Sequence, residues 1–151
     1  MKSRFRWPLT ASVLIIAVAF GIWAAFFRGP SEKCKPVIDI LEFNHAQAAR
    51  VSEQPADPNN PVPTQAEDLI YQQWADGLAE RAQKVSDPGL QVQAIQLAQL
   101  ADQFAAGLPG LRAAMHNRAP GAPPPPAALG MFALNQRIAD QAQQLSQACK
   151  S

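Results

Sequence analysis

The sequence predicts an all-α protein in which one N-terminal transmembrane helix precedes a four-helix, up-down-up-down domain closed by a disulfide. Residues 9–27 carry no charge and are mostly apolar. Four later segments repeat apolar residues at three- and four-residue spacing, the period of an amphipathic helix. The two cysteines bracket these four segments. We therefore expect a basic cytoplasmic tip at 1–8, a signal-anchor helix at 9–27 and an exported bundle at 34–151.

The N-terminal segment has the length and the flanks of a membrane anchor. As a helix, residues 9–27 would extend about 28 Å, close to the roughly 30 Å of a bilayer's hydrocarbon core. Three basic residues and no acid precede it, and the positive-inside rule then keeps the N-terminus in the cytoplasm. The alternative is a signal peptide cleaved after Ala17-Val18-Ala19, which would release a secreted protein. Apolar sequence continues past that site to Phe27, which favours the anchor.

The charge of the exported part disfavours nucleic acid as a partner. From Gly29 onward the chain has nine Lys or Arg and twelve Asp or Glu, a formal charge of −3. Binding to nucleic acid generally needs a basic face. The whole chain has eight Arg and five Lys and is rich in Ala and Pro, a usage typical of GC-rich bacteria. We therefore expect the plasma membrane of a bacterium as its location.

Cys34 and Cys149 are expected to form a disulfide. Cysteines exported across the membrane tend to be oxidised and paired. Closing so long a loop would stabilise the fold by at most about 4–5 kcal/mol through the entropy of the unfolded chain. The alternative is two unpaired thiols.

The first helix of the bundle is predicted over 36–52, with Pro36 in its first turn, where proline is tolerated. The segment 53–63 contains four prolines and two asparagines, a composition that excludes regular structure. We expect it to be a loop.

Two further helices are predicted over 64–86 and 88–107. Thr64 and Glu67 have the spacing of a capping box, in which each side chain satisfies a free backbone N–H of the first turn. Asp87-Pro88 can end one helix and start the next almost at once. Such a short joint requires an antiparallel helix pair.

The last helix is predicted over 127–149, after a proline-rich loop at 109–126. Pro109 is expected to end or kink the preceding helix. The apolar stripe of the last helix ends at Cys149, and in an up-down-up-down bundle this end lies beside the start of the first helix. Helix count and cysteine position therefore agree, and both proline-rich loops should lie at the outer pole.

The sequence contains no pattern that indicates catalysis, a metal site or a cofactor. His45 and His116 stand outside any metal or catalytic-triad spacing. Phosphate-binding, dinucleotide-binding and nucleophile-elbow motifs are missing from the sequence. We therefore predict that the protein is not an enzyme and needs no cofactor.

The leading functional hypothesis is a non-catalytic accessory or scaffolding subunit of a bacterial cell-envelope complex, partnered by other envelope proteins. Its expected contacts are a glutamine-rich face on the last two helices and the proline run Pro123, Pro124, Pro125 and Pro126. The alternative is a binder of a small apolar ligand or lipid inside the bundle. Its expected lining is Trp74, Phe104, Phe132 and Ile138, which an ordinary core would also contain.

Overall fold

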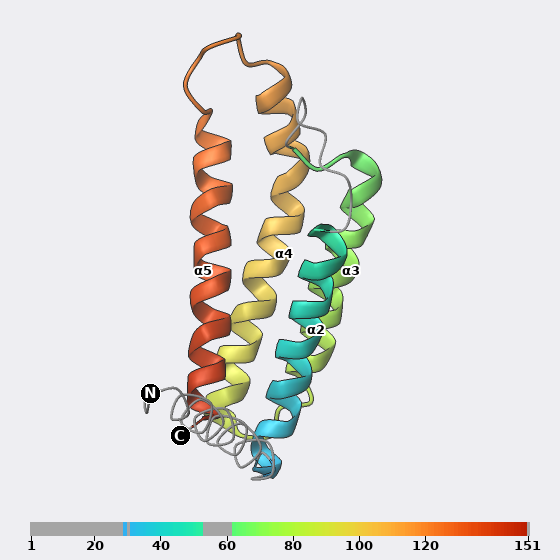
Figure 1. Ribbon diagram of the computed structural model, residues 1–151, viewed down its shortest axis with the longest axis vertical. Helices are drawn as coiled ribbons and strands as arrows, with labels where there is room; N and C mark the ends of the chain where they lie inside the picture. The colour runs from blue at the N-terminus through green and yellow to red at the C-terminus, as the bar shows by residue number, and fades with distance from the viewer. Residues whose placement is uncertain (1–28, 30, 53–61, 151) are drawn as a thin grey trace, which may run out of the picture. The chain divides into compact units, whose positions relative to one another are not determined.

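Four α-helices and one short 3-10 turn make up the part of the chain that the computed structural model describes, namely residues 29, 31–52 and 62–150 (Figure 1). The elements are η1 (Glu32–Cys34), α2 (Lys35–Ser52), α3 (Gln65–Ala82), α4 (Pro88–His116) and α5 (Pro126–Ala148). No strand occurs among these residues. The predicted all-α class with four helices is therefore confirmed.

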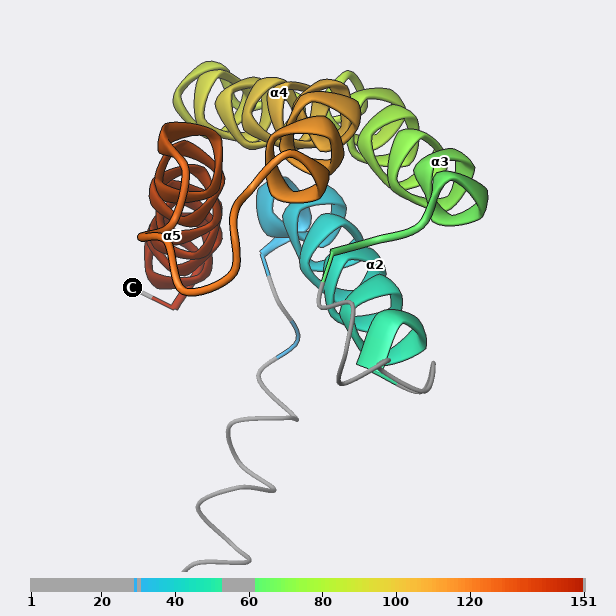
Figure 2. The ribbon, with the colours of Figure 1, turned by 90° about the horizontal axis from the view of Figure 1, so that it is seen from above.

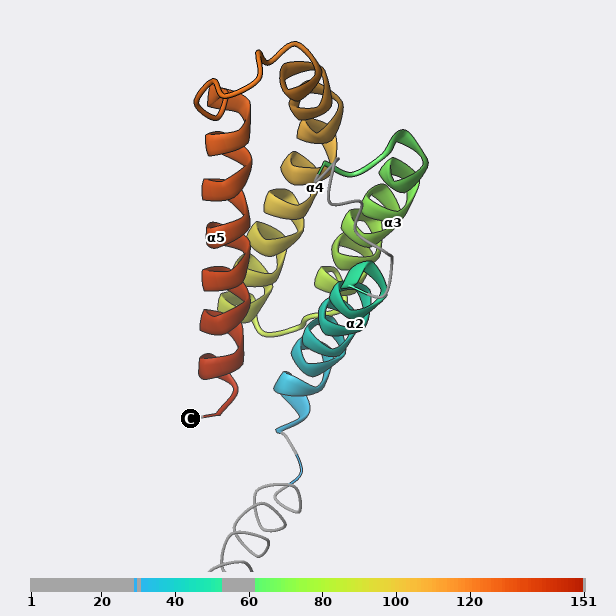
Figure 3. The ribbon, with the colours of Figure 1, turned by 45° about the horizontal axis from the view of Figure 1, so that its top comes forward.

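Successive helices run in opposite directions, and α4 lies between α3 and α5 (Figures 1 and 2). The most extensive contacts join α4 to its two neighbours, whereas α2 packs mainly on α3. The first turns of α2 lie near the end of α5, and α2 then diverges from α5 along its length (Figures 2 and 3). Contacts between α2 and α5 are consequently fewer than those between α2 and α3.

The core consists of the apolar stripes that the helices turn toward one another. The largest fully buried side chains include Ile40 of α2, Leu78 of α3, Leu97 of α4 and Leu145 of α5. Each contributes roughly 1.5–3 kcal/mol by leaving water. Four helices thus share one apolar core, in which no polar side chain of the described residues is buried.

The predicted disulfide between Cys34 and Cys149 is confirmed. Their Cα atoms lie 5.7 Å apart, and 115 residues of chain separate them. Cys34 is only 2% exposed and belongs to the core. The bond joins the start of α2 to the end of α5, so it closes the bundle at the end where these helices meet.

The start of α3 has the chemistry that its sequence predicts. Thr64 precedes the helix, and the Glu67 carboxylate accepts hydrogen bonds from the Thr64 backbone N–H (2.5 Å) and hydroxyl (2.8 Å). The capping box is therefore formed.

The predicted end of α3 near residue 86 is wrong, because the helix ends at Ala82. The Lys84 and Val85 N–H groups each donate to a carbonyl three residues back, which tightens the chain into a turn. This turn carries Val85 into the core, where it is 1% exposed. Asp87 then caps α4 by accepting a hydrogen bond from the Leu90 N–H at 3.0 Å.

The expected end of the next helix at 107 is also wrong, because α4 runs through Pro109 to His116. Proline removes one backbone hydrogen bond, but Pro109 is exposed and Leu108 beside it is fully buried. Arg112 holds the added turns by donating to the Pro63 carbonyl (2.9 Å) and to the Asp68 carboxylate. The second proline-rich loop therefore spans 117–125 rather than 109–126.

The predicted transmembrane helix at 9–27 and the loop residues 53–61 lie outside the described residues. Within the described residues, no helix is both long enough and apolar enough to cross a membrane.

Candidate functional site

A hollow of about 240 Å³, here called the aromatic cleft, lies among all four helices. Half of its lining residues belong to α2. The second half of α2 contributes Asn44, Gln47, Ala48 and Val51. The other three helices contribute Tyr71, Trp74, Phe104 and Asn135. The cleft therefore combines apolar walls with three side-chain amides.

Three aromatic rings from α3 and α4 pack against one another in this cleft. The Trp74 ring stands perpendicular to those of Phe104 and Tyr71, with centroids 6.2 Å and 6.4 Å away. Tyr71 and Phe104 are 5.6 Å apart and tilted by 45°. Edge-to-face pairs of this kind add about 0.5–1.5 kcal/mol to the burial of the rings. The rings consequently fix one another in place.

One of the three amides also holds the tryptophan. The Trp74 indole Nε1–H donates to the Asn44 side-chain oxygen at 3.0 Å and so ties α3 to α2. Among the described residues, no hydrogen bond uses the side-chain amides of Gln47 and Asn135. Each of these amides can donate and accept. The amides of the cleft can therefore bind a ligand that donates hydrogen bonds or one that accepts them.

The aromatic cleft contains no charged side chain. Its one titratable group is Tyr71, and burial raises the pKa of this phenol above its ordinary value of 10.0. The nearby Glu67 carboxylate raises this pKa further, as a second and smaller cause. The phenol thus stays neutral at physiological pH, and the cleft presents a neutral surface.

Two of the four residues expected to line an internal ligand site come together here. Trp74 and Phe104 are in contact, whereas Ile138 is 6% exposed and belongs to the core without lining the cleft. Phe132 is 65% exposed on α5. It directly follows the buried Met131, and one helical residue turns a side chain by about 100° around the axis. Phe132 therefore lies off the apolar stripe, contrary to the expected lining.

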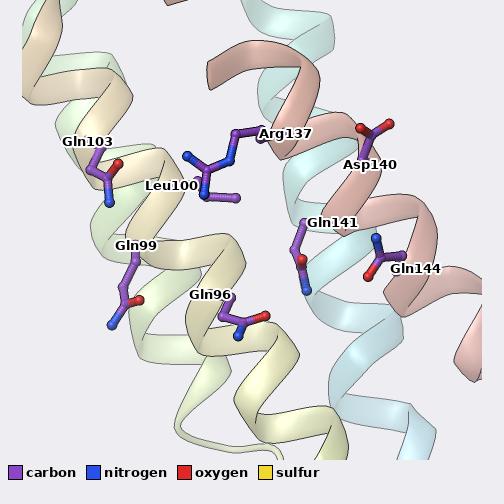
Figure 4. Close-up of a pocket in the computed structure, with 8 residues that line it drawn as sticks. All are labelled: Gln96, Gln99, Leu100, Gln103, Arg137, Asp140, Gln141 and Gln144. Carbon is purple, nitrogen blue, oxygen red and sulfur yellow. The ribbon is translucent and has the colours of Figure 1, made fainter. Parts of the chain in front are cut away.

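A second hollow, here called the glutamine groove, runs between α4 and α5 and has a volume of about 390 Å³ (Figure 4). The first helix contributes Gln96, Gln99, Leu100 and Gln103. The second contributes Arg137, Asp140, Gln141 and Gln144. Five of the eight lining residues are glutamines, as the polar faces of these two helices predict.

The glutamine groove is polar but carries little net charge. Arg137 extends toward α4 above Leu100, and Asp140 on the same helix offsets its charge (Figure 4). Gln141 links the two helices, because its side-chain N–H donates to the Gln93 backbone carbonyl at 3.2 Å. Glutamine amides match the donors and acceptors of peptide groups. The groove is therefore suited to a neutral, hydrogen-bonding surface.

The proline run lies at the end of the bundle opposite the disulfide (Figure 1). Pro123 and Pro124 are exposed, whereas Pro126 is the first residue of α5. Arg118 orders the loop by donating to the carbonyl oxygens of Ala122 and Pro123. The proline surface is thus exposed but short.

Neither histidine lines the aromatic cleft or the glutamine groove. His45 is exposed on α2, and His116 is the exposed last residue of α4. In the described part of the chain, no group of three or more His, Cys, Asp or Glu side chains could hold a metal ion. The aromatic cleft and the glutamine groove are therefore the candidate sites.

Neither a protein-family model, nor a curated protein, nor a solved structure matches this chain.

Proposed function

We propose that the protein is a membrane-anchored, extracytoplasmic helical domain that acts as a non-catalytic accessory or scaffolding subunit of a bacterial cell-envelope complex. The disulfide between Cys34 and Cys149 carries the proposal, because such bonds persist mainly outside the reducing cytoplasm. The uncharged segment 9–27 and the basic residues before it support an anchor with its N-terminus inside.

The glutamine groove is the proposed contact surface. Its amides can pair with backbone or side-chain groups of a partner without burying an uncompensated charge, which would be costly. The groove lies on α4 and α5, the two longest described helices, and a disulfide fixes the end of α5. A partner would therefore meet a surface that is largely ordered before binding, which lowers the entropic cost of association.

Site-specific photo-crosslinking in the native membrane tests this contact. A photoreactive phenylalanine derivative would replace Gln99 or Gln141 in the groove, and Gln72 on α3 as the matched control. All three are glutamines on helices, and only the first two line the groove. We expect one protein to be crosslinked from both groove positions and not from the control, with mass spectrometry identifying it.

The same experiment can contradict the proposal. Crosslinks of equal yield from Gln72 would mean that the captured protein is not held by the groove. A protein that yields no crosslink from either groove position, while the disulfide is intact, would exclude the groove as a contact surface.

The anchor is tested by the intact mass of the membrane-extracted protein. A chain that retains residues 1–28 supports the signal-anchor, whereas a chain that begins after Ala19 shows cleavage and secretion. Alkylation without reduction should modify no cysteine if the disulfide forms in the cell.

A further inference from the structure

We infer that the aromatic cleft binds a small, neutral aromatic molecule that carries a hydrogen-bonding group such as an amide or a hydroxyl. This inference is independent of the proposed scaffolding role, which rests on the glutamine groove. It concerns a different surface, which residues of all four helices line.

The aromatic cleft is open to solvent and has a volume of about 240 Å³, enough for a small molecule. Trp74 in its wall is held by the hydrogen bond to Asn44 and by edge-to-face packing against Phe104. The space therefore does not depend on a single mobile side chain.

The lining of the cleft favours a neutral ligand. No lining residue carries a charge, and an ion that enters an apolar hollow without a partner loses its hydration uncompensated. The unused amides of Gln47 and Asn135 instead offer neutral donors and acceptors. A neutral amide or hydroxyl on the ligand would satisfy them.

The aromatic side chains of the cleft favour a ligand that contains a ring. Three of the eight lining residues are aromatic, and edge-to-face or offset-stacked contact with a ring is favoured over contact with an alkyl chain. An alkyl chain would also leave the side-chain amides of Gln47 and Asn135 without partners. Of the small apolar ligand or lipid expected from the sequence, the lining favours a small molecule that has both a ring and a polar group.

Photoaffinity labelling of the full-length protein in detergent tests this inference by location. The probe is a neutral benzamide that bears an aryl diazirine, and peptide mapping by mass spectrometry locates the attachment. We expect labelling on α2 and α5 at residues of the cleft. Unlabelled benzamide should displace the probe, whereas benzoate, which is charged, and hexanamide, which has no ring, should require at least about tenfold higher concentration.

Two matched variants connect the labelling to the cleft. Ala48→Phe places a ring in the cleft and should lower labelling at least about tenfold. Ala46→Phe places the same ring on α2 at a position that does not line the cleft, and it should leave labelling unchanged. Asn135→Leu removes one side-chain amide from the cleft. The concentration of benzamide needed to displace the probe should then rise about fivefold, as expected for the loss of one hydrogen bond.

Three outcomes would overturn the inference. Labelling that survives Ala48→Phe, or that spreads over the surface of the bundle, would show that the probe does not enter the cleft. Equal displacement by benzoate would exclude a neutral site. Equal displacement by hexanamide would exclude recognition of a ring.

Discussion

Tyr71 is the only tyrosine of the chain, so its ionisation can be followed without interference. Burial raises its pKa above 10.0, and the Glu67 carboxylate adds to this effect. We predict that tyrosinate absorbance in native protein develops at higher pH than in urea. Since the unfolded state loses the proton first, stability should be fully present below pH 10 and should fall as pH rises through the native pKa.

A single substitution separates the two causes of this shift. Glu67→Gln removes the carboxylate but keeps a side chain that suits the capping box. Because burial is the larger cause, most of the shift should remain in this variant. Native and urea-unfolded protein that titrate at the same pH would show that Tyr71 is hydrated and that the cleft is open to water at its base.

Gly77 is required by close packing rather than by its backbone angles. A Cβ atom at this position would lie 2.4 Å from Cζ of Phe43. The Phe43 ring has little room to withdraw, because the Arg81 guanidinium covers it at 3.9 Å from the centroid. Arg81 is in turn held by an ion pair with Asp39 at 3.2 Å.

Gly77→Ala is therefore predicted to destabilise the fold. Helix propensity alone would favour alanine by about 1 kcal/mol, but overpacking typically costs about 1–3 kcal/mol. Gly130→Ala is the matched control, because a Cβ there meets nothing within 4 Å and should stabilise α5 by up to about 1 kcal/mol. Urea unfolding monitored by circular dichroism measures the unfolding free energy of both variants. A stabilised Gly77→Ala variant would show that Phe43 moves freely.

At the scale of elements, the last turns of α4 depend on one arginine. Arg112 pairs with Asp68 through two hydrogen bonds, of 3.1 and 2.6 Å, and also binds the Pro63 carbonyl. Both side chains of the pair are more than half buried. A bidentate, partly buried pair is stronger and less screened than a surface ion pair.

Arg112→Lys should keep the positive charge and lose the bidentate hydrogen bonding to the Asp68 carboxylate. We expect a loss of about 1 kcal/mol in unfolding free energy, and faster amide hydrogen exchange in residues 109–116 than in the first half of α4. Arg118→Lys, at an exposed arginine beyond the helix, is the control and should leave exchange in α4 unchanged. Uniform exchange along α4 in Arg112→Lys would mean that helix propensity alone maintains the turns after Pro109.

Helix starts were predictable from the sequence, whereas two helix ends were not. Starts depend on local chemistry, as with the Thr64 capping box and Asp87 before Pro88. The ends of α3 and α4 depend on tertiary contacts, namely burial of Val85 and the bonds of Arg112 to a segment more than 40 residues away. No local pattern carries that information.

For the whole molecule, the two cysteines indicated which helix ends meet, and the structure agrees. The sites were less predictable. Glutamines on two adjacent helices indicated the groove, because its residues follow a helical period. Of the residues predicted to line a ligand site, Trp74 and Phe104 line the aromatic cleft. Tyr71 lies one helical turn before Trp74 on α3, whereas Asn44 and Asn135 join the cleft from α2 and α5, which diverge from each other. Such divergence depends on how side chains pack between helices.

This divergence makes α2 the helix most dependent on the disulfide. It contacts α4 and α5 far less than α3, and its link to α5 lies at the end where Cys34 and Cys149 are bonded. The aromatic cleft takes half of its lining from α2. The bond should therefore control both the stability of the fold and the shape of the cleft.

We predict that the Cys34→Ala, Cys149→Ala double variant loses up to about 4–5 kcal/mol of unfolding free energy, since the unfolded chain regains the entropy of a long loop. Below the denaturation transition, amide exchange should rise in α2 more than in α4, because α4 keeps its contacts with α3 and α5. Reduced wild-type protein is the control, because it lacks the disulfide but keeps both cysteine side chains. It should show the same pattern of exchange. Equal increases in α2 and α4 would mean that the bundle opens only as a unit and that the disulfide does not hold α2 in particular.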